Sequence, residues 1–331
     1  MKKTLIFFLI LFVIAFFIRD DVSNLFTGRV VGGVEKTSVG MIPHDFGNIN
    51  VYFCPTDVCE DILADEIKNS ERVDCAFFEL GLAKVIDALR DVDHRVIIDN
   101  RYKGRVNMSS LHYDDRQELM HNKFCIFDDS KIFTGSMNPT KYGAYRNNNN
   151  LVIIDSRSLA RNYMDEFNEM WRGEFGKGGS VYYPAVNFNG VLIGNYFCPE
   201  DDCEGKVLEL LKSARKRIYF MTFSFTSDVL GEEIIRNFYY NVDIKGVFEK
   251  TQAGSEYSEY GKMKDLGMNV KKDNNKGMMH HKVFIVDDSV VFGSYNPSKS
   301  GNEKNDENIL IIHDRGVAEK FVEEFEKVWN L

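Results

Sequence analysis

The sequence predicts an α/β protein built from two tandem α/β/α sandwich repeats with mixed sheets, packed as a pseudo-dimer within one chain, after an N-terminal membrane anchor. Three observations predict this organisation. Apolar strand patterns alternate with helical patterns, which is typical of layered α/β units. Long stretches of the first half recur in the second half. A short apolar run follows two lysines at the N-terminus.

The duplication covers most of the chain. The segment Tyr52–Glu60 recurs as Tyr196–Glu204, with two cysteines, a proline and an aspartate at matching positions. Each copy continues with strands and helices in the same order and ends in a helix with an aromatic cluster containing Trp171 or Trp329. We therefore expect the following segments: an anchor or signal peptide over 1–20, a tether over 21–48, repeat 1 over 49–175, a Gly-rich linker over 176–194 and repeat 2 over 195–331.

The N-terminus combines Lys2 and Lys3 with an apolar run over residues 5–18. This run is shorter than the roughly 20 residues that span a bilayer, and no small-residue cleavage pattern follows it. The pattern favours an uncleaved signal anchor, with a cleaved signal peptide as the alternative. Because lysines stay on the cytoplasmic side, the remainder is expected on the extracytoplasmic side of the membrane.

Composition excludes a disordered chain, since 44% of the residues are hydrophobic and 13% aromatic. The net charge of −9 argues against a uniformly basic, nucleic-acid-coating surface. Positive charges do gather in loops before the motifs described next, where they line a groove for a polyanion or are simply solvated: Arg101, Lys103, Arg105, Arg116, Lys262, Lys264, Lys271, Lys272 and Lys276.

One short motif occurs twice, about 160 residues apart. His121 and Lys123 are followed by Gly-Ser-Met-Asn-Pro, and His280 and Lys282 by Gly-Ser-Tyr-Asn-Pro. Side chains alternate along a strand, so each His and Lys share one face. If the repeats pack about a pseudo-twofold axis, two imidazoles and two ammonium groups converge. Such a set suits the oxygens of a phosphodiester, with one His as nucleophile and the other as general acid.

The two copies differ at two points. Six residues separate Asp128 from Gly135, but only five separate Asp287 from Gly293. A missing residue flips strand parity unless a bulge is lost, which affects the expected placement of the residues that follow. In addition, Asn149 stands where the second repeat has Glu307. The two half-sites are therefore expected to differ in their pKa environments.

These residues resemble the signature of the phospholipase D superfamily, His-x-Lys-x4-Asp-x6-Gly-Ser-x-Asn. The likeness covers the chain after the tether and looks closest to the small nuclease and cardiolipin-hydrolase-like branch, here as a tandem. It implies metal-independent chemistry without a cofactor, through a covalent phosphohistidine. The catalytic residues that it implies are His121, Lys123, His280, Lys282 and Glu307.

The resemblance also implies roles for the surrounding residues. Glu307 would hydrogen-bond His121 and make it the nucleophile, while Asn149 would face His280 and leave it as the acid. Asp128 and Asp287 would be structural. Four residues of the turns would hold the substrate phosphate, the asparagines by direct contact and the serines in support: Ser136, Asn138, Ser294 and Asn296.

We therefore expect a membrane-anchored endonuclease that hydrolyses phosphodiester bonds, with no obligate protein partner. The basic loops and compact repeats favour nucleic acid as the substrate. The anchor keeps open a phospholipase D or cardiolipin hydrolase that acts on lipid headgroups. An inactive, membrane-tethered module that binds nucleic acid or anionic lipid is the alternative outside enzymes.

The cysteines fall into two groups. Cys54 with Cys59, and Cys198 with Cys203, are expected to form local disulfides on the extracytoplasmic side, with a zinc site or free thiols as alternatives. Cys75 and Cys125 lie inside apolar strands and are expected to be buried free thiols. His281 is expected to be a packing or solvated residue, because it points away from His280.

Overall fold

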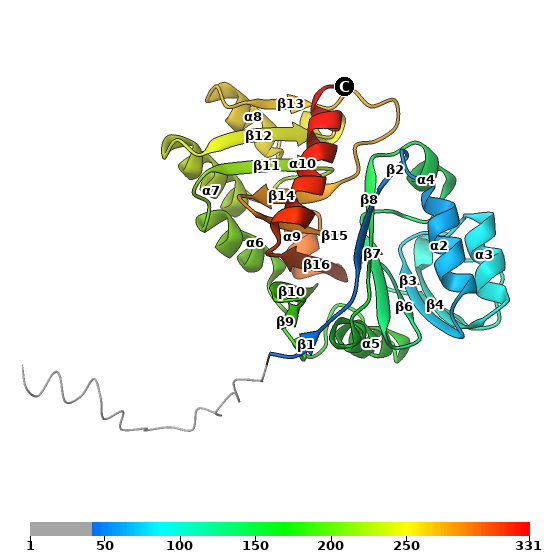
Figure 1. Cartoon of the computed structure of the whole chain (residues 1–331). Helices are drawn as coiled ribbons and strands as arrows, with labels where there is room; N and C mark the ends of the chain where they lie inside the picture. The colour runs from blue at the N-terminus through cyan, green and yellow to red at the C-terminus, as the bar shows by residue number, and fades with distance from the viewer. Residues whose placement is uncertain (1–41) are drawn as a thin grey trace, which may run out of the picture. The chain divides into compact units, whose positions relative to one another are not determined.

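The computed structural model describes residues 42–331 (Figure 1). The predicted anchor over 1–20, and the tether as far as residue 41, lie outside the described residues. Within residues 42–331, no helix has the length and apolar character needed to cross a membrane.

The first repeat forms a seven-stranded mixed sheet. Its strand order is β2-β8-β7-β6-β3-β4-β5, with β3, β4 and β5 parallel and the other neighbours antiparallel. The strands are β2 (Ile49–Cys54), β3 (Arg72–Phe77), β4 (Asp93–Asp99), β5 (Leu111–Asp114), β6 (Lys123–Phe127), β7 (Lys131–Gly135) and β8 (Asn149–Ile154).

The second repeat builds the same order and adds two strands at one edge. Its sheet runs β1-β9-β10-β16-β15-β14-β11-β12-β13. The strands are β9 (Ala185–Phe188), β10 (Val191–Cys198), β11 (Arg217–Thr222), β12 (Asp243–Phe248), β13 (Val270–Lys272), β14 (Lys282–Val286), β15 (Ser289–Gly293) and β16 (Glu307–Ile312). Residues of the predicted tether supply β1 (His44–Asp45), which pairs with β9 from the predicted linker, and β10 begins inside that linker. The prediction of two α/β repeats with mixed sheets is confirmed.

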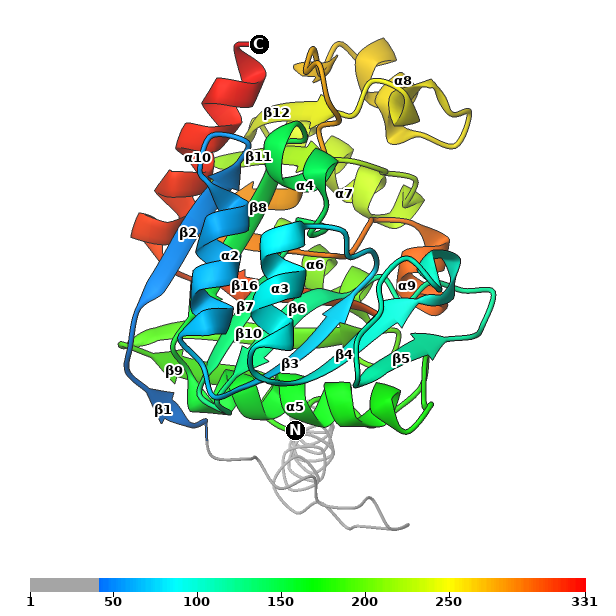
Figure 2. The same ribbon diagram turned by 90° about the vertical axis from the view of Figure 1, so that its right-hand side faces the viewer.

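Helices cover both faces of each sheet. Figure 2 looks onto α2 and α3, which cover the first sheet, and Figure 1 shows α6 and α7 beside the second. The helices are α2 (Cys59–Lys68), α3 (Ala83–Arg90), η1 (Asn100–Tyr102), α4 (Lys141–Tyr145), α5 (Arg157–Trp171), α6 (Cys203–Lys212), α7 (Asp228–Tyr239), η2 (Gln252–Gly254), α8 (Glu259–Asp265), α9 (Lys299–Glu303) and α10 (Arg315–Trp329).

The inner faces of the two sheets share one apolar core. Phe124 from β6 and Phe167 from α5 belong to the same buried cluster as Phe292 from β15 and Phe321 from α10. Separate clusters fill the space under α2 and α3 in one repeat and under α6, α7 and α8 in the other. Because burial of apolar area is the main force for association, this shared core fixes the repeats against each other and brings their motifs together.

The one-residue deletion in the second repeat is absorbed by a hairpin loop. In repeat 1, Phe127 pairs with Lys131 across a three-residue loop, whereas in repeat 2 Val286 pairs with Ser289 across a two-residue loop. Asp128 and Asp129 in the first loop and Asp287 in the second adopt left-handed backbone angles, which Asp tolerates better than most residues. Gly135 and Gly293 therefore occupy equivalent places, and the parity of β15 is kept.

The cysteines form three disulfides. Cys54–Cys59 and Cys198–Cys203 are bonded as predicted, so the zinc alternative is excluded for these four residues. The prediction that Cys75 and Cys125 are free thiols is wrong, because they are bonded to each other. They sit directly opposite on antiparallel strands β3 and β6, with Cα atoms 4.1 Å apart. The sequence did not reveal this register.

Candidate active site

The two His-x-Lys motifs meet at the interface between the repeats, where parallel backbone bridges join them. The His121 amide donates to the carbonyl oxygen of Asp306 at 2.9 Å, and the His280 amide to that of Asn148 at 2.9 Å. Each histidine is thus held by the residue that directly precedes β16 or β8 of the opposite repeat. The four motif side chains are buried: His121, Lys123, His280 and Lys282.

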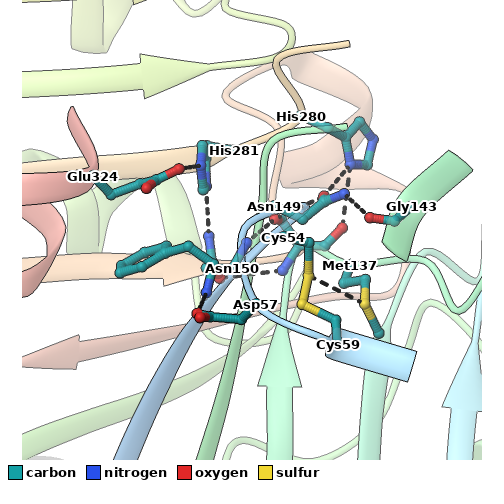
Figure 3. The surroundings of a disulfide bond; sticks show 12 residues. Cys54, Asp57, Cys59, Met137, Gly143, Asn149, Asn150, His280, His281 and Glu324 are labelled. Carbon is teal, nitrogen blue, oxygen red and sulfur yellow. Dashed lines mark hydrogen bonds and ion pairs between the residues drawn. A yellow bond between two sulfur atoms is a disulfide. The ribbon is translucent and has the colours of Figure 1, made fainter. Parts of the chain in front are cut away.

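The histidines have different partners. His121 Nδ1 lies 2.8 Å from Glu307 Oε2, and Glu307 is fully buried. His280 Nδ1 lies 2.9 Å from Asn149 Oδ1 (Figure 3). It also lies 3.2 Å from the carbonyl oxygen of Ser136. The Nδ1–H of each ring can donate to these oxygens, which leaves each Nε2 for chemistry. The structure therefore pairs one histidine with a carboxyl group and the other with neutral groups.

The lysines follow a repeated pattern. Lys123 Nζ donates to the carbonyl oxygen of His121, and Lys282 Nζ donates to that of His280 at 2.8 Å. Lys123 Nζ lies 5.3 Å from the centre of the Phe78 ring, and Lys282 Nζ lies 4.9 Å from that of Phe223. These cation–π contacts orient the ammonium groups without neutralising them.

Burial controls the protonation of this cluster. It lowers the pKa of Lys123 to about 7, and burial together with Lys123 lowers the pKa of Lys282 well below its ordinary value. Burial and the two lysines likewise lower the pKa values of His121 and His280. Burial raises the pKa of Glu307 to about 8, against the opposing influence of Lys123.

Four basic side chains are therefore buried around the carboxyl group of Glu307, and the carboxyl group of Asp99 also acts on Lys123. A bound phosphodiester would add a negative charge, raise the pKa of the lysines and histidines and favour their charged forms. Charged lysines in turn oppose the effect of burial on the pKa of Glu307. The arrangement favours an anionic ligand.

The Gly-Ser-x-Asn turns are held by the serines. The Ser136 hydroxyl accepts from the amide of Asn150, and the Ser294 hydroxyl from the amide of Asn308. Both serines are fully buried, so they brace the turn against the adjacent strand. Asn138 and Asn296 follow on these turns, and in each the side-chain oxygen is buried without a hydrogen-bond partner.

Asp128 and Asp287 lie away from the histidines. Asp128 accepts from the amides of Glu71 and Arg72, and Asp287 accepts from the amides of Arg215, Lys216 and Arg217. Each carboxylate thus fixes the entrance to the central strand β3 or β11.

His281 is buried, and the structure excludes the solvated interpretation. Its Nδ1 lies 3.1 Å from Asn150 Nδ2, and its Nε2 lies 3.5 Å from Glu324 (Figure 3). At the equivalent position of repeat 1, Asn122 accepts from Asn308 Nδ2 at 2.7 Å. These residues join the repeats behind the site.

Four of the nine basic residues predicted to line a groove form ion pairs within the described fold. Arg101, Arg105 and Lys262 pair with nearby carboxylates, and the Arg116 guanidinium contacts Asp114 and, across the repeat boundary, Asp306. Asp306 also presents its carbonyl oxygen to His121. The pairing of Arg116 with Asp306 therefore braces the His121 half-site.

Sequence reasoning missed two pairs of residues at the site, Phe78 with Phe223 and Lys250 with its carbonyl partner Asn275. The phenylalanines follow β3 and β11 at equivalent places, and their rings lie edge-on to His121 and His280, at 5.0 and 4.8 Å. An alignment of repeat 1 with repeat 2 would have identified this pair, because the two phenylalanines occupy equivalent positions. Nothing in the sequence marks Lys250.

Comparison with known proteins identifies the same two repeats. Residues 63–171 and 207–329 match the family model described as "Cardiolipin synthase, PLD-like domain". The chain belongs to this family. The predicted resemblance to the phospholipase D superfamily is thereby confirmed for both PLD-like repeats.

Among curated proteins, the mitochondrial cardiolipin hydrolase of Xenopus tropicalis is 29% identical over 137 residues, which are 40% of this chain and 65% of the frog protein. The phospholipase D of Rickettsia prowazekii (strain Madrid E) is 22% identical over 143 residues, 43% of this chain and 70% of that protein. The first match thus spans just under two thirds of its relative's length.

A solved structure extends the likeness to both repeats. The phosphatidylserine synthase of Haemophilus influenzae Rd KW20 superposes with a TM-score of 0.64 at 12% identity, over 84% of this PLD-like chain and 85% of the other. At this identity the likeness concerns the fold.

Proposed function

We propose that this protein is a phosphodiesterase that cleaves nucleic acid endonucleolytically through a phosphohistidine on His121. The observation that carries the proposal is the unequal pairing of the two buried histidines, His121 with Glu307 and His280 with Asn149. A carboxylate that accepts the Nδ1–H of His121 makes its Nε2 more nucleophilic. The relatives named above as cardiolipin hydrolase and phospholipase D support phosphodiester hydrolysis as the reaction class.

In the first step, His121 Nε2 attacks phosphorus and forms an N–P bond. The P–O bond to the leaving alcohol breaks, and the proton on His280 Nε2 passes to that oxygen. In the second step, His280 Nε2 accepts a proton from water as the water oxygen attacks phosphorus. The N–P bond breaks, its electron pair returns to His121, and a phosphomonoester is released.

The remaining residues stabilise charge. Lys123 and Lys282 supply the positive charge for the phosphate oxygens, and the side-chain amides of Asn138 and Asn296 add neutral donors. Ser136 and Ser294 keep the asparagine turns in place through their hydrogen bonds to β8 and β16.

A trapping experiment tests the proposal. The full-length protein is mixed with radiolabelled single-stranded DNA, quenched in alkaline denaturant, which preserves N–P bonds, and digested for peptide mapping. We expect label on the peptide that contains His121, and its loss in His121→Ala. Label on His280 instead, or turnover without a trapped adduct in any variant, contradicts the assignment.

A lipid substrate is the second candidate, and the names of the curated relatives favour it. Release of phosphatidic acid from cardiolipin or phosphatidylglycerol vesicles, faster than cleavage of any nucleic acid, would establish it in place of the nuclease. Membrane attachment through residues 1–20 remains part of the proposal. It predicts that the full chain sediments with membranes, whereas a protein cleaved after that segment does not.

A further inference from the structure

A cavity of about 530 Å³ opens beside His280 at the interface between the repeats. Repeat 1 contributes Phe78, Tyr102 and Tyr142, and repeat 2 contributes Lys250, Lys276 and Met278. Its volume lies within the usual range for small-molecule sites. The lining also includes the carboxylates of Glu79 and Glu249, and Met278 is its only large aliphatic side chain. The wall therefore offers flat rings and polar or charged groups rather than a surface for acyl chains.

Hydrogen bonds of Asn149 connect the wall of this cavity to His280. Asn149 Oδ1 lies 2.9 Å from His280 Nδ1, and Asn149 Nδ2 donates to the carbonyl oxygen of Gly143 in α4 at 3.0 Å (Figure 3). Tyr142 precedes Gly143 in the same helix. A Cβ at Gly143 would lie 2.0 Å from the carbonyl oxygen of Asn138, so the glycine lets α4 pack against the Asn138 turn. This packing fixes the position from which Tyr142 lines the cavity.

Because the chain is duplicated, residues that line this cavity can be compared with the residues at equivalent positions of the other half-site. Tyr142 in α4 corresponds to Ser300 in α9, and Lys276, four residues before His280, corresponds to Gln117, four residues before His121. An aromatic ring and a cation are therefore present at the His280 end where the matching positions have a hydroxyl and an amide. Tyr142 is 66% exposed, and within residues 42–331 Lys276 takes part in no ion pair. Both side chains are accessible to a ligand.

We infer that this cavity is the subsite for the leaving group, and that it takes an unpaired nucleotide, with the base against Tyr142 and the next phosphate near Lys276. The inference rests on the proposed function. In-line attack by His121 directs the leaving oxygen toward the acid, His280, and the cavity adjoins that residue. Aromatic rings bind single-stranded nucleic acid by stacking on its bases, and this stacking requires bases that are not paired in a duplex.

Two substrates of equal length test the inference: single-stranded oligothymidylate, and the same sugar–phosphate chain made without bases. We expect the protein to cleave the base-bearing strand with about ten-fold higher kcat/KM, since stacking on one ring is of this order. Tyr142→Ser, which installs the residue of the other repeat, should remove that preference. Tyr142→Phe should retain it.

Tyr239→Ala is the matched control, because Tyr239 in α7 has the same 66% exposure and does not line the cavity. It should keep the preference for bases. Lys276→Gln should lower the salt dependence of oligothymidylate cleavage, with a change of about 0.7 in the slope of log(kcat/KM) against log[salt].

The outcomes separate the inference from the proposed function. Cleavage with a His121 adduct but equal rates on both strands, or an unaltered preference in Tyr142→Ser, overturns the inference alone. Faster cleavage of a duplex than of the single strand also overturns it. Cleavage of cardiolipin vesicles without cleavage of either strand, or no cleavage and no adduct, overturns both.

Discussion

The two repeats share one strand order and one motif, but they carry different residues at several equivalent positions. Cys75 and Cys125 bridge β3 and β6, whereas the matching residues of β11 and β14 are Phe220 and Phe284, which face each other with ring centres 5.9 Å apart. Either a covalent bond or an aromatic pair fills this place in the sheet. Structural positions therefore tolerate exchange as long as the space is filled.

At the interface between the repeats the same kind of divergence has chemical consequences. Glu307 and Asn149 occupy matching places, yet one is an ionisable partner for His121 and the other a neutral partner for His280. The bracing also differs. Arg116 holds Asp306 with charge, while Asn275 holds Asn148 with a neutral amide hydrogen bond. The comparison indicates that the repeats have specialised at the site while keeping a common fold.

The largest expected difference concerns the leaving group. His280→Ala should lower cleavage of DNA on the order of 10³-fold, because the leaving alkoxide then receives no proton. A diester with a p-nitrophenolate leaving group needs no such proton, and its first step should be much less affected. Burst kinetics of p-nitrophenol release measure that step. An equal loss on both substrates would contradict the assignment of His280 as the acid.

The second prediction compares the disulfides. Chain entropy depends on the length of the loop that is closed, which is 50 residues for Cys75–Cys125 and 5 for Cys54–Cys59. Replacing both cysteines by alanine should lower the free energy of unfolding by about 4 kcal/mol for the first pair and about 2 kcal/mol for the second. Denaturant unfolding of each double variant measures this, and a larger loss for Cys54–Cys59 than for Cys75–Cys125 would contradict the dependence on loop length.

Glu307 provides the third test. Glu307→Gln keeps the shape of the side chain but removes the carboxylate beside His121, so kcat should fall about 10- to 100-fold. Asn149→Ala, which removes the neutral partner of His280, should have a smaller effect on adduct formation. Rapid-quench measurement of adduct formation compares the variants. A larger loss in Asn149→Ala would exchange the proposed roles.

The smallest effect is a pH dependence of anion binding. Burial lowers the pKa of Lys123 to about 7, so this lysine is charged below pH 7 and loses its charge as the pH rises. Affinity for vanadate should therefore fall above pH 7, by up to about ten-fold per pH unit for one proton. Calorimetry at several pH values measures it. Affinity that rises with pH would contradict the buried, depressed lysine.

Much of this architecture could be predicted from the sequence. The recurrence of Tyr52–Glu60 as Tyr196–Glu204 and the strand–helix alternation identified two α/β repeats, because such patterns are local and periodic. Aligning the repeats identified Glu307 and Asn149 as the position where the half-sites differ. The chain has no comparable local pattern for Arg116 with Asp306, which are 190 residues apart.

The duplication, the two His-x-Lys motifs and the unequal residues beside them can be read from the order of residues alone. Three features become visible only in the folded chain: how the missing residue is accommodated, that Cys75 faces Cys125, and that the cavity lies beside His280. Each of these depends on strand register or on packing between the repeats, where residues far apart in the chain meet. Register and packing follow from the shared core as a whole, not from any one segment.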